Sequence, residues 1–422
     1  MSISFKILIS RFLTRSGDQA WDFAVPLLLI TLFPHNLKLA FIYFFALRLS
    51  SMLLMPYLGK FIDEVKRSTI VKVGLLTQGL SVLFTGLLLF MHTYGQAHGL
   101  SISFEIFYLL LLFFGITSNL GVNMMDIAVA NDLVPTVIAQ EELARFNSRL
   151  RQVDLSTEVF SPICAGLLLS LSSQDSPLLG IGLIIGWNLI SFVPELFILT
   201  GIIAKKPALD DPKTIIISSS ESLFKKFVKG WSAFQRSRVA WVIMANACLW
   251  LTVLSPHGVL LTAFLKGAWD IPEYVIGLFR ALGAIFGLIS TFLYPMAHRR
   301  FGLVSTGKMF ISYQSLMVLM AFIFSFSLET TYQYLFMLFI LFSRTGLYGF
   351  GLAETELRQI RINAAERGRI NGVSQAMTSF ATVLVYGLGI IFSTPESFIF
   401  LVGISALSVV VGGVIFNFKV TD

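Results

Sequence analysis

Long apolar stretches recur along the whole 422-residue chain, and they constrain its fold more than any other feature. Windows of membrane-spanning length predict about twelve spans. They cover residues 5–33, 37–59, 69–92, 102–131, 149–171, 177–204, 238–265, 273–298, 303–328, 331–357, 367–393 and 395–418. Only 13% of the residues are charged, whereas soluble domains carry roughly a quarter. We therefore predict an all-α membrane protein that crosses the bilayer many times.

Basic residues gather in alternate loops, which predicts the orientation of the chain. They cluster around Lys60–Arg67, Arg145–Arg151, Lys205–Arg238, Arg299–Arg300 and Arg358–Arg369. The positive-inside rule places these loops, and with them both termini, in the cytoplasm. The net charge of +7 is then a matter of topology and does not indicate nucleic-acid binding. Compact loops without a long insertion between the halves favour a bacterial inner membrane.

The spans divide six and six around one polar segment. This gives a predicted N-lobe at 1–204, a cytoplasmic linker with an amphipathic surface helix at 205–237, and a C-lobe at 238–422,. Residues 59–67 form a Gly-xxx-Asp-xx-Lys-Arg loop after the second span, and 298–302 occupy the matching place in the second half. Such a loop with two six-span halves is typical of the major facilitator fold, which binds substrate between its lobes.

Asp18 lies about a dozen residues into the first span, where a carboxylate costs several kcal/mol unless it meets water, a cation or a partner,. Thr14 precedes it and Asp22 follows it by one turn, so three oxygen-bearing side chains share a face. In the sixth span Asn188, Ser191 and Glu195 share another face. Pro194 is predicted to break this helix and to free a nearby backbone carbonyl, such as that of Phe192,. Oxygen donors of this kind suit a hard or borderline cation. Ser191 fits polar contact between helices equally well.

His257 is the histidine that lies deep within a span, between Pro256 and Gly258. This setting predicts local unwinding that turns the imidazole inward. Histidine is the usual ligand for first-row divalent metals and titrates near neutral pH. A hydrogen-bonded core histidine is the alternative interpretation.

A second polar group lies where the fourth and fifth spans reach the cytoplasm. We interpret it as an inner gate that breaks when the lobes rock; its members are Arg67, Asp132, Asn147, Arg151 and Asp154. For two further features the sequence does not decide between lining a cavity and packing between helices. They are the face of Asn119, Asn123 and Asp126, and the isolated Gln78.

Enzymatic activity is disfavoured, because the chain has no nucleotide-binding glycine loop, no Ser/His/Asp set and no hydrolase metal spacing,. No catalytic cofactor is expected. Cys164 and Cys248 lie in apolar spans without a partner motif and are predicted to be inert thiols,.

Five ordered stretches resemble the ferroportin family of iron exporters, a branch of the major facilitator superfamily. They are Ser16–Val25, Asn147–Asp154, Gly186–Ser191, Lys206–Leu209 and Glu366–Val373. The resemblance implies that Asp18 is a metal ligand and that the gate residues form the family's inner gate. The family's histidine after the first ligand is Asp22 here, and its second-site cysteine and histidine are Gly258 and Val385. A single site between the lobes that uses His257 is therefore expected, and regulation by hepcidin is not.

The resemblance also implies a calcium site in the N-lobe that activates transport. Its ligands fall on Asp18, Gln78, Asn188 and Glu195, with Gly79 in place of an asparagine. Two carboxylates and two amides suit Ca²⁺. Asp18 and Asn188 would then serve either ion, and the sequence leaves that choice open.

Together these features predict a monomeric transporter of a divalent metal, Fe²⁺ with Co²⁺ and Ni²⁺ accepted. The predicted ligands are Thr14, Asp18, Asn188, Ser191, Phe192 and His257. Because metal needs a neutral imidazole, protons compete with it at His257, which predicts export by alternating access with proton antiport. The alternative is a facilitator for a small organic cation with Asp18 as counter-ion.

Overall fold

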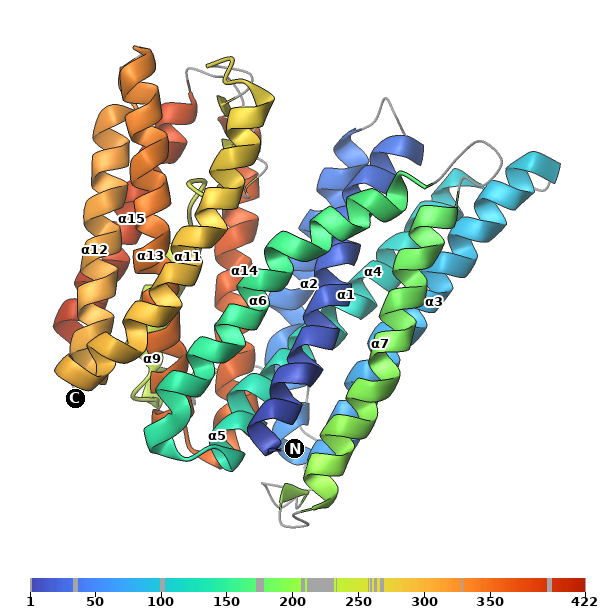
Figure 1. Ribbon diagram of the computed structural model, residues 1–422, viewed down its shortest axis with the longest axis horizontal. Coiled ribbons are helices and arrows are strands. Elements are labelled where there is room, and N and C mark those ends of the chain that lie inside the picture. Colours follow the sequence, from blue (N-terminus) through green and yellow to red (C-terminus); the bar gives the residue numbers. More distant parts are fainter. Residues whose placement is uncertain are drawn as a thin grey trace. The chain divides into compact units, whose positions relative to one another are not determined.

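The protein is helical throughout the part that its computed structural model describes, and this part contains no strand (Figure 1). The described residues are 2–32, 37–98, 103–171, 178–205, 209–210, 231–232, 234–256, 258, 260–261, 264–265, 269–327, 329–392 and 397–421. The helices are α1 (Ile3–Leu32), α2 (Leu37–Glu64), α3 (Arg67–His98), α4 (Phe104–Asp126), η1 (Ile127–Leu133), α5 (Val134–Val137), α6 (Gln140–Leu169), α7 (Leu179–Ala204), α9 (Ala240–Trp250), α11 (Glu273–Phe301), α12 (Leu303–Phe324), α13 (Thr330–Arg361), η3 (Ala364–Glu366), α14 (Arg367–Ile391) and α15 (Phe398–Lys419).

For eleven of the twelve predicted spans a helix begins within three residues of the predicted start, and α6 begins nine residues before the predicted fifth span. In the described part of the chain, 8 segments are long and apolar enough to cross a membrane. They are Ile42–Glu64, Arg67–His92, Phe104–Val137, Leu179–Ala204, Val275–Phe301, Leu303–Phe324, Thr330–Arg361 and Phe398–Lys419. The all-α, multi-pass membrane architecture is therefore confirmed, and the count of twelve spans stays a prediction.

The first compact unit comprises Met1–Val137, Ser156–Gly230 and Ala364–Ala376. Within it α1 lies beside α7, and α3 contacts both α4 and α7. Its core is built where apolar faces of these helices meet, around Trp21, Phe107, Leu111 and Ile184. Because lipid is as apolar as these side chains, close packing and polar contacts hold such helices together in a membrane.

The second compact unit comprises Ile138–Leu155, Trp231–Asn363 and Met377–Asp422. Helices α12 and α13 pack along their lengths, and their core includes Val318, Phe336 and Ile340. The units follow the two halves of the sequence except in two segments. The start of α6 groups with the second unit, and the start of α14 groups with the first, so the units cross the predicted lobe boundaries there.

The start of α14 is held on α2 by an acid and by glycines. Both oxygens of Asp63 accept hydrogen bonds at 2.7 Å, from the backbone N–H groups of Gly368 and Arg369. These N–H groups lack partners within their own helix, and a carboxylate suits that positive end. A Cβ atom at Gly59 would overlap the carbonyl oxygen of Gly368. The close approach therefore requires glycine at this point, which explains the glycine at the head of the sequence motif.

Helix α9 ends at Trp250, and residues 251–256 are not helical. The exposed backbone groups find other partners: Val253 N–H donates to Ser405 Oγ at 2.9 Å, and Arg344 donates to the Leu254 carbonyl at 2.6 Å. The unwinding predicted before Pro256 is thus confirmed. His257 itself lies outside the described residues.

Helix α7, in contrast, continues through Pro194 without interruption. The prediction that this proline breaks the helix is wrong. Proline removes only one N–H donor, and packing of α7 against α1 and α3 keeps the remaining helix intact,.

Candidate metal site

Polar side chains of α1 and α7 meet along the contact between these helices in the first unit. The hydroxyls of Thr14 and Ser10 donate to Oε1 of Glu195, the latter at 3.4 Å. About two turns earlier in α7, the amide nitrogen of Asn188 donates to the carbonyl of Gly17 at 3.2 Å,. Asn188 therefore contacts Gly17, the residue before Asp18. The predicted polar faces of α1 and α7 are thus brought together.

Several oxygens of this group are buried yet have no hydrogen-bond partner in the described part of the chain. They are Oδ2 of Asp18, Oε2 of Glu195 and Oε1 of Gln78, whose Nε2 is likewise unpartnered. Buried polar atoms in proteins are nearly always hydrogen-bonded, so each exception calls for an explanation. Carboxylate and amide oxygens with free lone pairs are the ligands that Ca²⁺ and other hard cations take. These residues fit a cation.

The other predicted ligands of α7 are buried with them. Ser191 Oγ donates to the Asn188 carbonyl at 2.8 Å, which leaves its oxygen able to accept or coordinate. The ring of Phe192 packs against Gly79 of α3, where a Cβ would lie 3.1 Å from it. Glycine at position 79 thus makes room for Phe192, beside the Gln78 that the sequence left open.

Burial is the main influence on the Asp18 carboxylate. The charges of Arg15, Asp22, Asp126 and Glu195 act on it as well. Asp22 is exposed. Among the residues that the structure describes, no three His, Cys, Asp or Glu side chains come close enough to hold a metal. The polar side chains that α1 and α7 bring together offer carboxylate, amide and hydroxyl oxygens.

Sequence reasoning missed a pair of arginines beside this site. Arg11 and Arg15 of α1 both reach Asp126 of α4, Arg15 with one nitrogen at 2.8 and 2.7 Å from the two carboxylate oxygens. The signal was present, because two arginines spaced by four residues precede Asp18 inside an apolar stretch. Asp126, left open between cavity lining and packing, is an ion-pair partner.

Two of the five predicted gate residues pair within the first unit. Arg67 Nε lies 2.7 Å from Oδ2 of Asp132, and Arg67 also donates to the Leu209 carbonyl. Asp132 belongs to the π-helical η1, a widened turn that is common at functional sites,. Arg367 adds a hydrogen bond at 3.1 Å to Thr136. Arg367 belongs to Glu366–Val373, one of the stretches that resemble the ferroportin family.

The remaining three predicted gate residues lie on the part of α6 that belongs to the second unit. Asn147 exchanges two amide hydrogen bonds with Gln359 of α13, at 2.6 and 3.2 Å. Arg151 covers the ring of Tyr348 at 4.5 Å and lies 3.7 Å from Asp154. These contacts fasten α6 to α13.

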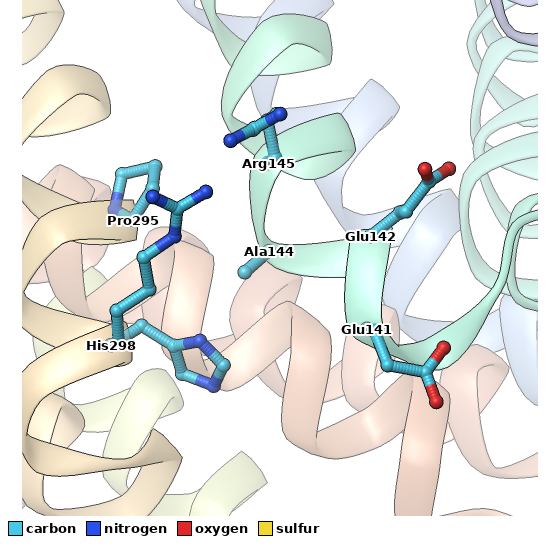
Figure 2. Close-up of a pocket in the computed structure, with 7 residues that line it drawn as sticks. Glu141, Glu142, Ala144, Arg145, Pro295 and His298 are labelled. Carbon is cyan, nitrogen blue, oxygen red and sulfur yellow. The ribbon is translucent and has the colours of Figure 1, made fainter.

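A small pocket of about 140 Å³ opens near these residues, between α6 and α11 (Figure 2). Both signs of charge line it, with Glu141, Glu142 and Arg145 from α6 and His298 and Arg299 from α11. None of the predicted metal ligands is among its lining residues.

Comparison with known proteins agrees with this geometry. The family model for Ferroportin1 (FPN1) matches residues 1–409. The chain is 39% identical to a protein named Ferreportin from Bdellovibrio bacteriovorus, over 99% of this chain and 94% of that protein. A solved bacterial homologue of the iron transporter ferroportin, outward-facing with soaked iron, is 38% identical with a TM-score of 0.90, over 100% of both chains. The major facilitator transporter FucP shares the fold at 12% identity and a TM-score of 0.69, over 99% of both chains.

Fold and site thus define a multi-pass membrane protein of the major facilitator class, whose members are transporters. Within that class, the chain belongs to the ferroportin family.

Proposed function

We propose that this protein transports Fe²⁺, accepts Co²⁺ and Ni²⁺, and exports its cargo by alternating access coupled to proton antiport. The observation that carries the proposal is the buried, unpartnered oxygen of Asp18 inside a membrane helix, next to Asn188. An intramembrane carboxylate of this kind is expensive unless a cation or water compensates it. The relative with soaked iron supports iron as the cargo.

Asp18 would supply the charge of the site, and Thr14, Asn188, Ser191 and the Phe192 carbonyl would supply neutral oxygens. Thr14 and Asn188 hold their positions through hydrogen bonds to Glu195 and Gly17, which pre-organises the oxygens before the ion arrives,. An all-oxygen set suits Ca²⁺ better than it suits Fe²⁺. The imidazole of His257 would therefore provide the preference for a first-row transition metal.

A ligand from each half of the chain makes metal affinity depend on lobe closure, so the ion itself can bias the alternating-access equilibrium. Metal and proton compete for the imidazole, which couples export to proton entry. The predicted inner gate would open and close the cytoplasmic side of the transport path. Its members are Arg67, Asp132, Asn147, Arg151 and Asp154. We propose that the protein works as a monomer in a bacterial inner membrane with cytoplasmic termini, without hepcidin regulation or catalysis.

We further propose that Ca²⁺ activates transport by binding Asp18, Gln78, Asn188 and Glu195. Three of these residues, Asp18, Gln78 and Glu195, carry buried oxygens that have no hydrogen-bond partner among the described residues. Binding of Ca²⁺ there would order α1, α3 and α7 together, since one ligand or more comes from each helix.

The test is metal flux in proteoliposomes across a pH gradient. Wild-type protein should move Fe²⁺ and Co²⁺ against an opposing proton flux, and His257→Ala should lose both high affinity and pH dependence. His98→Ala, a histidine that the sequence places at a span end, is the matched control. Unchanged affinity and pH dependence in His257→Ala would reject antiport through this residue. Absence of saturable Co²⁺ binding in calorimetry would instead favour the organic-cation facilitator.

A further inference from the structure

Helix α1 carries two cations as well as the acid of the candidate metal site. Arg11 and Arg15 lie one turn apart, and both nitrogens that contact Asp126 come from side chains that are only 12% and 17% exposed. Arg15 holds the two oxygens of Asp126 at 2.8 and 2.7 Å. Two arginines of α1 thus share the carboxylate of Asp126 on α4.

This group lies directly beside the candidate metal site. Arg15 precedes Asp18 by three residues, which is close to one helical turn and about 5 Å of rise. Arg15 and Asp126 are both among the charges that act on the Asp18 carboxylate. The neighbouring Ser10 and Thr14 point instead to Glu195 on α7. Helix α1 thus presents oxygens on one side and fixed positive charge on the other.

We propose that the Arg15–Asp126 ion pair sets the metal affinity of the Asp18 site, with Arg15 acting as a tethered cation that weakens binding of the cargo. The inference rests on the proposed function. Coulomb repulsion grows with the charge of the bound ion, so a fixed guanidinium opposes a divalent ion twice as strongly as a monovalent one. A transporter needs this weakening, because cargo that binds too tightly is not released.

A purely structural role makes a different prediction. If the ion pair only fastens α1 to α4, its loss from either side should loosen the same contact and change metal affinity in the same direction. If its charge matters, the two sides must act in opposite directions. Arg15→Gln removes the opposing cation, whereas Asp126→Asn removes the anion that masks it. Both variants disrupt the two-oxygen contact between Arg15 and residue 126, although Asp126→Asn retains one acceptor oxygen.

The experiment is calorimetric titration of Co²⁺ into full-length protein in detergent, at low and moderate salt. Arg15→Gln should tighten binding by roughly two orders of magnitude and Asp126→Asn should weaken it by as much, as expected for a unit charge about 10 Å from a divalent ion at an effective dielectric near 20. Arg15→Lys keeps the charge without the two-oxygen contact and should stay within about threefold of wild type.

Each outcome decides the proposal. Shifts of the same sign in Arg15→Gln and Asp126→Asn, or no shift in either, overturn it while leaving the proposed function intact. Wild-type protein that binds no Co²⁺ overturns both. Should Asp126→Asn fail to fold, Arg11→Gln replaces it: this variant removes the other cation and should tighten binding, whereas a loosened helix contact would weaken it.

Discussion

Two buried acids of the second unit and two of the candidate metal site are held in contrasting ways. In the second unit, Glu356 accepts a hydrogen bond from Tyr294 at 2.7 Å and lies 3.5 Å from His298. Glu354 forms an ion pair with Arg358 at 2.7 Å. In the first unit, Glu195 receives hydroxyl donors on one oxygen only, and Oδ2 of Asp18 has no donor from the described residues.

This difference separates acids that hold the fold together from acids that have binding capacity left. A buried carboxylate is stable when donors fill its lone pairs, and then its loss weakens the fold. A buried carboxylate with one oxygen that lacks a donor lowers the stability of the ligand-free protein, and ligand binding restores that stability. Mutation of Glu356 or Glu354 should therefore change the stability of the protein, whereas mutation of Asp18 or Glu195 should change its affinity for metal.

The largest effect is expected at Asp18. Asp18→Asn keeps the shape but removes the charge, and should weaken Co²⁺ binding a thousandfold or more, about 4 kcal/mol. Thermal stability without metal should stay the same or rise, since an uncompensated buried acid is removed. The exposed Asp22 provides the control, and Asp22→Asn should change affinity by less than about tenfold. Calorimetry and thermal unfolding measure both quantities, and equal effects of the two variants would contradict the comparison.

Much of this contrast could be predicted from the sequence. Asp18, Asn188, Ser191 and Glu195 were expected on two facing helices because polar residues at helical spacing in an apolar span must point away from lipid. The structure brings these faces of α1 and α7 together. Helical periodicity fixes which residues share a face, and the cost of burying charge fixes where that face points.

What the sequence could not predict depends on contacts between distant segments. Nothing near Arg11 indicates Asp126, more than a hundred residues away. The exchange of Ile138–Leu155 and Ala364–Ala376 between the units was missed because both segments look like ordinary span ends. The break expected at Pro194 does not occur because neighbouring helices support α7 through that turn, whereas the segment after Trp250 has Ser405 and Arg344 to receive its freed backbone groups.

An effect of intermediate size is expected at Glu356. Glu356→Ala leaves the fully buried hydroxyl of Tyr294 without an acceptor and should lower the free energy of unfolding by about 3 kcal/mol,. Co²⁺ affinity should not change. Combining it with Tyr294→Phe should recover part of the loss, since the orphaned hydroxyl is then gone. Thermal unfolding of the two single variants and the double variant measures this coupling. A thousandfold loss of Co²⁺ affinity in Glu356→Ala would mean that the second unit binds metal too.

The smallest effect, and the one that separates the units most sharply, is expected at Gln78. Both amide atoms of this side chain are buried without a partner among the described residues. Gln78→Met conserves volume and should therefore raise the stability of the calcium-free protein by about 1 kcal/mol. It should also abolish most of the Ca²⁺-dependent rise in melting temperature, because one oxygen ligand is lost.

Gln314 of the second unit is the matched control, since its Oε1 is also buried and unpartnered in the described chain. Gln314→Met should raise stability by a similar or smaller amount and leave the Ca²⁺ response intact. Only at a position whose unpartnered oxygen binds Ca²⁺ should the substitution both raise stability and remove the Ca²⁺-dependent rise in melting temperature. If both variants respond to Ca²⁺ like wild type, the empty oxygens of the first unit are a packing cost, as at Gln314, and the calcium proposal fails at Gln78.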